Sequence, residues 1–411
     1  MNKKVIVVGA GAAGLICAGT AAMNGAEVTL IERNDKVARK VMITGKGRCN
    51  VTNNCNMLNE LISNVPVNGR FLYSAFSRFM PDDTMAFFED LGVELKVERG
   101  NRVFPVSDKA VDIVDALNRF IKSNAVKRVQ GRVTSLIIED NQLKGVETET
   151  GEQFFADTVV IATGGKSYPQ TGSTGDGYDL ARQAGHNIVK LKPSLVPLSV
   201  HENWCSDLMG LSLRNCAIKI IDTENYREVY NDFGEMLFTH FGVSGPVILS
   251  ASSHLKNMKK GRYELFIDLK PALSEEQLDS RLQRDIAKNS NKDFINSLGD
   301  LLPQKMIPVI VKLSGIPPHL KANQITRDMR HDLTYLLKNL KLTITDFRPI
   351  EEAIVTSGGV DTKEINPKTM ESKLLQGLFF AGEVIDVDAY TGGFNLQIAF
   401  STGHLAGENC I

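Results

Sequence analysis

The chain has 411 residues, of which 43% are hydrophobic and 23% charged, as in ordinary globular proteins. Its 47 Lys and Arg nearly balance 48 Asp and Glu, which excludes a general electrostatic attraction to nucleic acid or membrane. The six cysteines form no CxxC pair, which excludes a zinc ribbon and a dithiol redox motif. The apolar start runs on into a second strand and is no signal peptide, so we expect a cytoplasmic protein with reduced thiols.

The first forty residues predict a dinucleotide-binding unit. Residues 5–8 form a β-branched strand, and Gly9, Gly11 and Gly14 follow at GxGxxG spacing. In that motif the glycines allow a tight turn, a close approach of pyrophosphate to the backbone, and close helix–strand packing. A second strand ends at Glu32, whose carboxylate suits ribose hydroxyls and favours FAD or NAD over NADP.

The stretch ITGKGRCNVTN, residues 43–53, has the look of an anion-binding loop. A P-loop is excluded because position 40 is Lys and position 47 is Gly. We expect this stretch to lie across the pyrophosphate from the first loop, although a plain basic turn is the alternative. The residues expected to close over the diphosphate and ribityl chain are Thr44, Gly45, Arg48 and Asn50. Cys49 is interpreted as a packing residue, with a lowered thiol pKa as the alternative.

Two later segments favour FAD over NAD. Short strands between residues 126 and 162 lead to the loop Thr163-Gly164-Gly165, a meander followed by ATGG that is similar to two-domain flavoproteins. Near the C-terminus, a strand precedes Gly382-Glu383 and Asp386, and a Gly392-Gly393 turn opens a helix near Asn395. The N–H groups at such a helix start can stabilise negative charge on a reduced flavin. The chain has no second GxGxxG motif.

The middle of the chain predicts an insert. Residues 194–271 alternate apolar and polar positions, which predicts a β-domain that residues 341–356 rejoin. Residues 272–340 predict a helical subdomain that begins with a capping box at Ser274 and Gln277. The rest is expected to form a discontinuous α/β FAD-binding domain with a Rossmann-like sheet, from residues 1–193 and 345–411.

Six segments, in order along residues 1–411, resemble the bacterial BaiN-like flavoproteins, usually described as NAD(P)/FAD-dependent oxidoreductases or aminoacetone oxidases. They are ARKVMITGKGRCNVTN, NRVFPVSDKAVDIVDAL, ATGGKSYPQTGSTGDGYDLARQAGH, GEMLFTHFGVSGPVIL, EEAIVTSGGVD and GLFFAGEVIDVDAYTGGFNLQIAFSTG. The resemblance implies FAD contacts at Gly9, Gly11, Ala13, Gly14, Glu32, Lys40, Thr44, Gly45, Arg48, Asn50, Val133, Gly164, Glu383, Asn395 and Leu396. From the same motifs we add Arg33, Gly47, Cys49, Ala162, Thr163, Gly165, Gly382, Asp386, Gly393 and Phe394.

Candidates for catalysis are fewer. We expect the substrate to meet the flavin between the FAD domain and the insert. In FTHFGVSGP, His240 is a candidate acid or base and Ser244 lies nearby, although a glycine-rich turn explains the segment equally well. Tyr168, after the ATGG turn, is a third candidate. Arg102 could pair with a substrate carboxylate, although a surface salt bridge explains a single Arg better. No HxH or HxxxH spacing occurs, so no metal is expected.

We therefore predict an FAD-dependent oxidoreductase that transfers a hydride between a small organic substrate and the flavin, with NADH or NADPH as a candidate electron donor. Two alternatives stay open. One is a flavoprotein that acts on RNA, of the tRNA-modifying type, for which residues 255–262 are the one compact basic run, although a solvated turn also explains that run. The other is an FAD-binding redox sensor or electron carrier. We expect neither a nucleic-acid nor a membrane partner, and the oligomeric state does not follow from the sequence.

Overall fold

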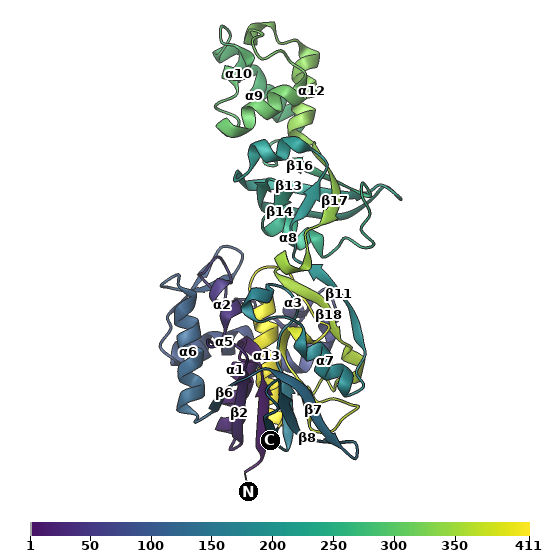
Figure 1. Cartoon of the computed structure of the whole chain (residues 1–411). Helices are drawn as coiled ribbons and strands as arrows, with labels where there is room; N and C mark the ends of the chain where they lie inside the picture. The colour runs from purple at the N-terminus through teal and green to yellow at the C-terminus, as the bar shows by residue number, and fades with distance from the viewer. Residues whose placement is uncertain (1) are drawn as a thin grey trace. The chain divides into compact units, whose positions relative to one another are not determined.

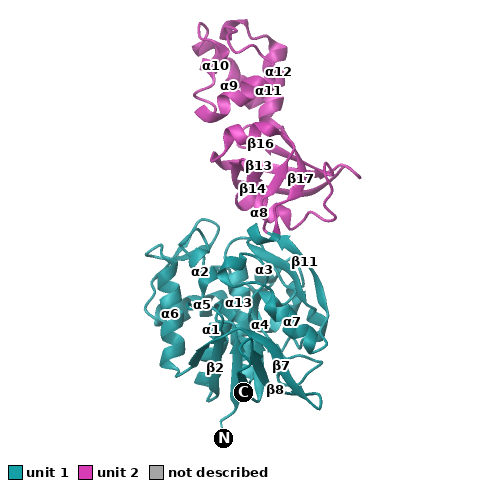
Figure 2. Ribbon diagram, in the orientation of Figure 1, with its two compact units in different colours: residues 1–194, 350–411 teal, residues 195–349 magenta. Residues whose placement is uncertain are grey.

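The computed structural model describes residues 2–411, and the chain forms two compact units. Unit 1 runs from the N-terminus to Ser194 and resumes from Ile350 to Ile411, and unit 2 comprises Leu195–Pro349 (Figure 2). Each unit has its own hydrophobic core. Among residues 2–411, no helix is both long and apolar enough to cross a membrane.

Unit 1 is built on a five-stranded parallel sheet with strand order β19-β10-β1-β2-β6. The strands are β1 (Lys4–Val8), β2 (Glu27–Glu32), β6 (Lys127–Gln130), β10 (Thr158–Ile161) and β19 (Leu378–Phe380). Strands β10 and β1 inside the sheet and β19 at its edge are buried along almost their whole length, which is why each forms an uninterrupted apolar run in the sequence. This sheet confirms the Rossmann-like fold predicted from the GxGxxG segment.

Helices α1 (Ala12–Met23) and α13 (Phe394–Asn409) pack together in unit 1 (Figure 1). Small residues permit the close approach: a Cβ on Gly403 would lie 2.4 Å from the Ala13 carbonyl oxygen, and one on Gly407 would lie 2.7 Å from that of Cys17. Helix α6 (Ala110–Ser123) packs on α1, where Phe120 fills the space beside Gly19. The N- and C-terminal segments of the chain thus form one continuous core.

Smaller elements complete unit 1. Its other helices are α2 (Arg39–Ile43), α3 (Leu58–Ser63), α4 (Tyr73–Arg78), α5 (Pro81–Asp90) and α7 (Asp176–Gln183). Its small sheets are β3-β5-β4 (Thr52–Asn53, Arg102–Pro105, Leu95–Glu98), β7-β8-β9 (Val133–Glu139, Gln142–Thr148, Gln153–Phe155) and β11-β18 (Ile188–Ser194, Val355–Val360). The turn between β7 and β8 has positive φ at Asp140 and Asn141, the residue types that tolerate it.

Unit 2 combines a closed barrel with a helical part. The barrel order is β12-β15-β14-β13-β16-β17 (Leu198–Val200, Gly242–Ser244, Arg227–Thr239, Ser212–Asp222, Tyr263–Asp268, Leu340–Phe347). The helices are α8 (Pro246–Ser252), α9 (Glu275–Lys288), α10 (Phe294–Ser297), α11 (Ile307–Ser314) and α12 (Arg327–Lys338). The predicted capping box is present, since the Ser274 side chain accepts from the Gln277 N–H and the Gln277 side chain accepts from the Ser274 N–H.

The structure changes one predicted boundary. We expected residues up to about 356 to rejoin the inserted β-domain, but β18 pairs with β11 in unit 1. Gly358, at φ +89°, would place a Cβ only 2.5 Å from the Lys190 carbonyl oxygen, so this pairing depends on glycine. In addition, the helical part shares its core with the barrel, because Leu278 and Leu337 lie in the same buried cluster as Ile267.

Candidate functional site

Unit 1 contains a cleft whose empty space, counted together with its solvent-open mouth, is about 1080 Å³. It opens where β1, β2, β10 and β19 end, the carboxyl edge of the sheet at which open α/β folds bind ligands. The lining residues are Gly9–Ala13, Glu32, Asn34, Lys36, Ala38–Val41, Thr44, Ala162–Gly164, Thr171–Ser173, Ile354, Val355, Ala381–Glu383, Val387, Asn395, Leu396, Ile398 and Ala399.

The glycine-rich turn has the geometry that its spacing predicts. Gly9 has φ +101°, and a Cβ on Gly14 would stand 1.9 Å from the Gly9 carbonyl oxygen, so α1 can pack on the turn only with glycine there. A Cβ on Gly11 would have no atom within 4 Å, so its backbone faces the open cleft. Helix α1 begins directly after Gly11 with Ala12 and Ala13, and its N-terminal N–H groups can bind an anion.

Glu32 closes the end of β2 and is almost buried. Its carboxylate accepts hydrogen bonds from the backbone N–H of Ala10 at 2.7 Å and of Asn34 at 2.8 Å. The acid therefore fixes the glycine-rich turn at the cleft rim. The adjacent Arg33 points elsewhere: its guanidinium donates to Thr174 and forms an ion pair with Asp176 at 3.2 Å. Arg33, predicted to contact FAD, does not line the cleft.

The opposite wall carries an ion pair. The Lys40 Nζ lies 2.7 Å from a Glu383 carboxylate oxygen, and both side chains line the cleft. Lys40 belongs to α2, and Glu383 to the short 3-10 helix η8 (Gly382–Val384) that follows β19. Thr44 lines the cleft below Lys40, to whose carbonyl oxygen its hydroxyl donates at 2.9 Å.

Helix α13 points its N-terminus at the cleft. Gly393 caps it at φ +101°, where a Cβ would stand 2.3 Å from the Thr52 carbonyl oxygen. The Asn395 side chain accepts from the Ala389 N–H at 2.9 Å and donates to its carbonyl oxygen at 2.8 Å, which fixes the loop before the helix. Asn395 and Leu396 line the cleft. Asp386 does not line it: Asn68 donates to its carboxylate at 3.0 Å, and burial raises its pKa.

These residues fit FAD. Two helix N-termini and the cations Lys36, Arg39 and Lys40 suit a diphosphate. Thr163 also lines the cleft, but its hydroxyl oxygen is buried beside Gly177 and has no hydrogen-bond partner within the described residues. Within residues 2–411, no group of three or more His, Cys, Asp or Glu is arranged to hold a metal ion.

The loop 43–53 contributes less than predicted. Arg48 does not line the cleft: its Nε donates to Asp108 at 2.8 Å, it pairs with Glu98, and it stacks 4.1 Å from the Phe104 ring centroid. Cys49 is fully buried, which raises its thiol pKa to about 12, so a lowered thiol pKa is wrong for it. Thr44 is the one predicted residue of this loop that reaches the cleft. Besides Arg33, Arg48, Cys49 and Asp386, the predicted cofactor residues outside the cleft lining are Gly14, Gly45, Gly47, Asn50, Val133, Gly165, Gly393 and Phe394.

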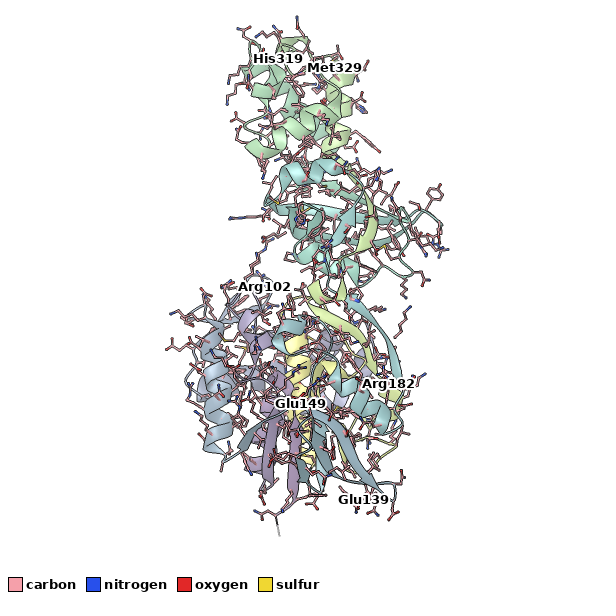
Figure 3. All side chains as sticks on the ribbon, viewed as in Figure 1. Arg102, Glu139, Glu149, Arg182, His319 and Met329 are labelled. Carbon is pink, nitrogen blue, oxygen red and sulfur yellow. The ribbon has the colours of Figure 1, made fainter. Side chains whose placement is uncertain are left out.

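The predicted catalytic residues are not gathered at the cleft. His240 is exposed in the turn between β14 and β15, and Ser244 ends β15, so both belong to unit 2. Tyr168 is half-buried in unit 1 and outside the cleft lining, and burial raises its pKa. Arg102, on β5 of unit 1 (Figure 3), donates to the Arg99 carbonyl oxygen at 3.0 Å and also lies outside the lining.

Several lining residues escaped the sequence analysis. Asn34 and Lys36 lie in the loop after Glu32 and Arg39 begins α2, and the cations there were a usable signal for an anion site. Ile354 and Val355 reach the cleft because β18 pairs with β11, a contact that no local pattern indicates. Ile398 and Ala399 lie one turn into α13 and share its cleft-facing side with Asn395.

Comparison with known proteins decides the family. The family described as "HI0933-like protein Rossmann domain" matches residues 3–409. The chain belongs to this family. A 3-dehydro-bile acid delta(4,6)-reductase of Clostridium scindens is 32% identical over 99% of this chain and 98% of its own. A ribosomal RNA dihydrouridine synthase of Escherichia coli is 31% identical over 99% of this chain and 97% of its own.

Solved structures agree on the fold. The 3-ketosteroid delta1-dehydrogenase of Sterolibacterium denitrificans superposes with a TM-score of 0.52 and 13% identity, covering 100% of this chain and 99% of that one. The predicted family, fold and cofactor are confirmed: the chain is an FAD-dependent oxidoreductase of the BaiN-like type. The individual FAD contacts and catalytic residues stay predictions.

Proposed function

We propose that this enzyme reduces a carbon–carbon double bond conjugated with a carbonyl group, and that it works in the cytoplasm. The support is the reaction type that its relatives share. One is a 3-dehydro-bile acid delta(4,6)-reductase and the other a ribosomal RNA dihydrouridine synthase. A ketone in conjugation with ring double bonds and a uracil ring both present a C=C bond activated by a carbonyl. This shared chemistry carries the proposal.

The reaction adds two hydrogens across the double bond. When bound and reduced by NADH or NADPH, FAD would supply the hydride for the carbon farther from the carbonyl, and the nearer carbon would take a proton from water. The N-terminal N–H groups of α13 favour negative charge at the cleft. The cleft has an apolar part of its wall, which limits the water inside it and is formed by Ile354, Val355, Leu396 and Ile398.

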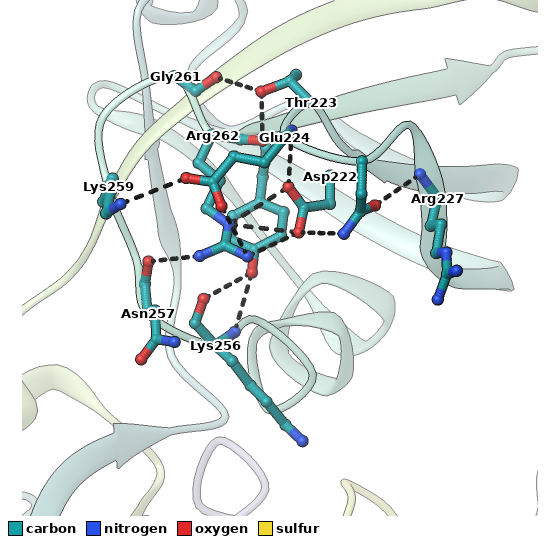
Figure 4. Close-up of polar contacts among 11 residues, drawn as sticks. Asp222, Thr223, Glu224, Arg227, Lys256, Asn257, Lys259, Gly261 and Arg262 are labelled. Carbon is teal, nitrogen blue, oxygen red and sulfur yellow. Dashed lines mark hydrogen bonds and ion pairs between the residues drawn. The ribbon is translucent and has the colours of Figure 1, made fainter.

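A substrate of the bile-acid type is the first candidate, a small conjugated ketone. The net charge of −1 supports it, because no large positive field attracts a polyanion. The basic run 255–262 is also partly neutralised: Arg262 pairs with Asp222 at 2.8 Å and with Glu224 at 3.3 Å, and Lys259 lies 3.4 Å from Glu224 (Figure 4). These ion pairs join the β13–β14 turn to the loop before β16.

Uridine in ribosomal RNA is the second candidate. The observation that favours it is the 31% identity over almost the whole length of the Escherichia coli enzyme, matched by a second synthase from Haemophilus influenzae at 30%. An enzyme of this kind binds phosphates electrostatically, so its affinity for RNA must fall with salt.

The decisive experiment is anaerobic reoxidation. The FAD-loaded protein is reduced with NADH or NADPH and then mixed with a steroid 4-en-3-one or with ribosomal RNA that lacks dihydrouridine. Recovery of the oxidised flavin spectrum, with two hydrogens added to the product by mass spectrometry, supports the proposal and names the substrate class. If neither compound reoxidises the flavin while an artificial acceptor does, the proposal fails and an electron carrier is indicated.

A further inference from the structure

Behind the cleft wall, two hydroxyl side chains support the Lys40–Glu383 pair. Ser167 lies just after the ATGG loop, and Thr356 lies in β18; both are fully buried or nearly so, and neither lines the cleft. The Lys40 Nζ donates to the Ser167 Oγ at 2.6 Å. The Thr356 Oγ1 accepts from the backbone N–H of Lys166 at 2.8 Å and of Ser167 at 3.2 Å.

Glu383 is held from the same side. One carboxylate oxygen accepts from the Thr356 backbone N–H at 2.8 Å and from the Ser167 hydroxyl at 3.1 Å, and the other accepts from Lys40. The Ser167 hydrogen has a second acceptor within reach, the Ile354 carbonyl oxygen at 3.3 Å, but the carboxylate is closer and charged. Ser167 is therefore an acceptor for Lys40 and a donor for Glu383 at once.

The packing leaves this arrangement little freedom. A Cβ on Gly165 would lie 2.4 Å from the Thr356 hydroxyl oxygen and 2.9 Å from a Glu383 carboxylate oxygen. The backbone of the ATGG loop therefore presses directly against both side chains. Four segments distant in sequence meet here: α2, the loop after β10, β18 and η8.

We propose that Ser167 and Thr356 are positioning residues for FAD binding. Ser167 fixes the Lys40 ammonium and the Glu383 carboxylate as one unit in the cleft wall, and Thr356 fixes Ser167. Without the Ser167 hydroxyl, the Lys40 ammonium keeps, among the described residues, Glu383 alone as its hydrogen-bond partner and Glu383 loses one donor, so the pair is held less firmly and part of the FAD binding energy is spent on ordering it. The inference rests on FAD binding and is independent of the substrate class proposed above.

The test is a double-mutant cycle read by FAD titration of the apoprotein, which needs no substrate. S167A should raise the FAD Kd about tenfold, the scale of one lost charge-assisted hydrogen bond. If Ser167 acts through Lys40, the double variant S167A/K40M should have an FAD Kd less than about twofold above that of K40M alone. T356V should weaken FAD binding, and T356S, which keeps the hydroxyl, should restore it.

The matched control is S194A. Ser194 is also buried and donates to a buried carboxylate, that of Asp388 at 2.7 Å, but Asp388 does not line the cleft, whereas Glu383 does. S194A should keep the wild-type FAD Kd, and S167A should lower the melting temperature of the apoprotein no more than S194A does. An unchanged Kd in S167A, or the same fold-change in the wild-type and K40M backgrounds, overturns the proposal. Because the readout is FAD binding, failure here differs from failure to reduce either substrate.

Discussion

At the scale of single residues, Arg48 and Lys40 lie eight positions apart and have different partners. Arg48 is bound to Glu98 and Asp108 and stacked on Phe104, away from the cleft. We therefore expect R48A to change the FAD Kd less than about twofold, because exposed ion pairs act locally. K40M should weaken FAD binding clearly. Fluorescence titration of both variants checks this. Loss of FAD from R48A would contradict it and would support the role predicted from the sequence, in which Arg48 closes over the diphosphate.

His186 provides a pH-dependent contribution to stability. Its ring is buried between Glu364 at 3.0 Å and the Ser372 hydroxyl at 2.7 Å, and desolvation lowers its pKa despite the opposing effect of Glu364. The unfolded chain thus binds this proton more readily, so this stabilisation is fully present above about pH 6.5 and is lost as the pH falls below that value through the lower pKa of the folded state.

We expect H186Q to be less stable than the wild type at neutral pH, with a gap that narrows toward pH 5. Glutamine keeps a donor and an acceptor but does not titrate. Denaturant unfolding of both proteins across this range measures the gap. A difference in unfolding free energy that stays constant with pH would contradict the assignment.

At the scale of elements, two glycines of the β1–turn–α1 segment have different roles, one in folding and the other in ligand binding. Gly14 has no room for a Cβ, whereas Gly11 has open space toward the cleft and φ −80°, which any residue adopts. G14A should therefore lower both the melting temperature of the apoprotein and FAD occupancy. G11A should leave the apoprotein melting temperature near wild type but weaken FAD binding, since the added methyl group enters the space of the ligand. Equal melting temperatures for the two variants would refute this division of roles.

At the scale of the whole molecule, the two units have separate cores, and every residue that lines the cleft belongs to unit 1. FAD at 100 times its Kd adds about 2.7 kcal/mol to the stability of the folded state that binds it. We expect hydrogen exchange to slow in β1, α1 and the start of α13, while the barrel strands of unit 2 keep their rates. Equal protection of both units would show that they unfold as one cooperative body.

The sequence by itself determined the FAD fold, because the relevant signals are local. A buried strand, a GxGxxG turn and a helix occupy consecutive residues, and Glu32 ends the next strand. The same holds for the capping box at Ser274 and for the glycine turn that opens α13. In each case backbone geometry restricts the residue type at a fixed spacing, so the pattern can be read without knowing the tertiary contacts.

Only the tertiary structure decided which charges face the cleft. Lys40 and Arg48 are both basic residues of one segment, but Arg48 meets acids brought by other elements, while Lys40 meets Glu383, 343 positions away. Ile354 and Val355 enter the site through the pairing of β18 with β11. Charge pairing and strand pairing depend on which distant segments the fold brings together, and that information is absent from local spacing.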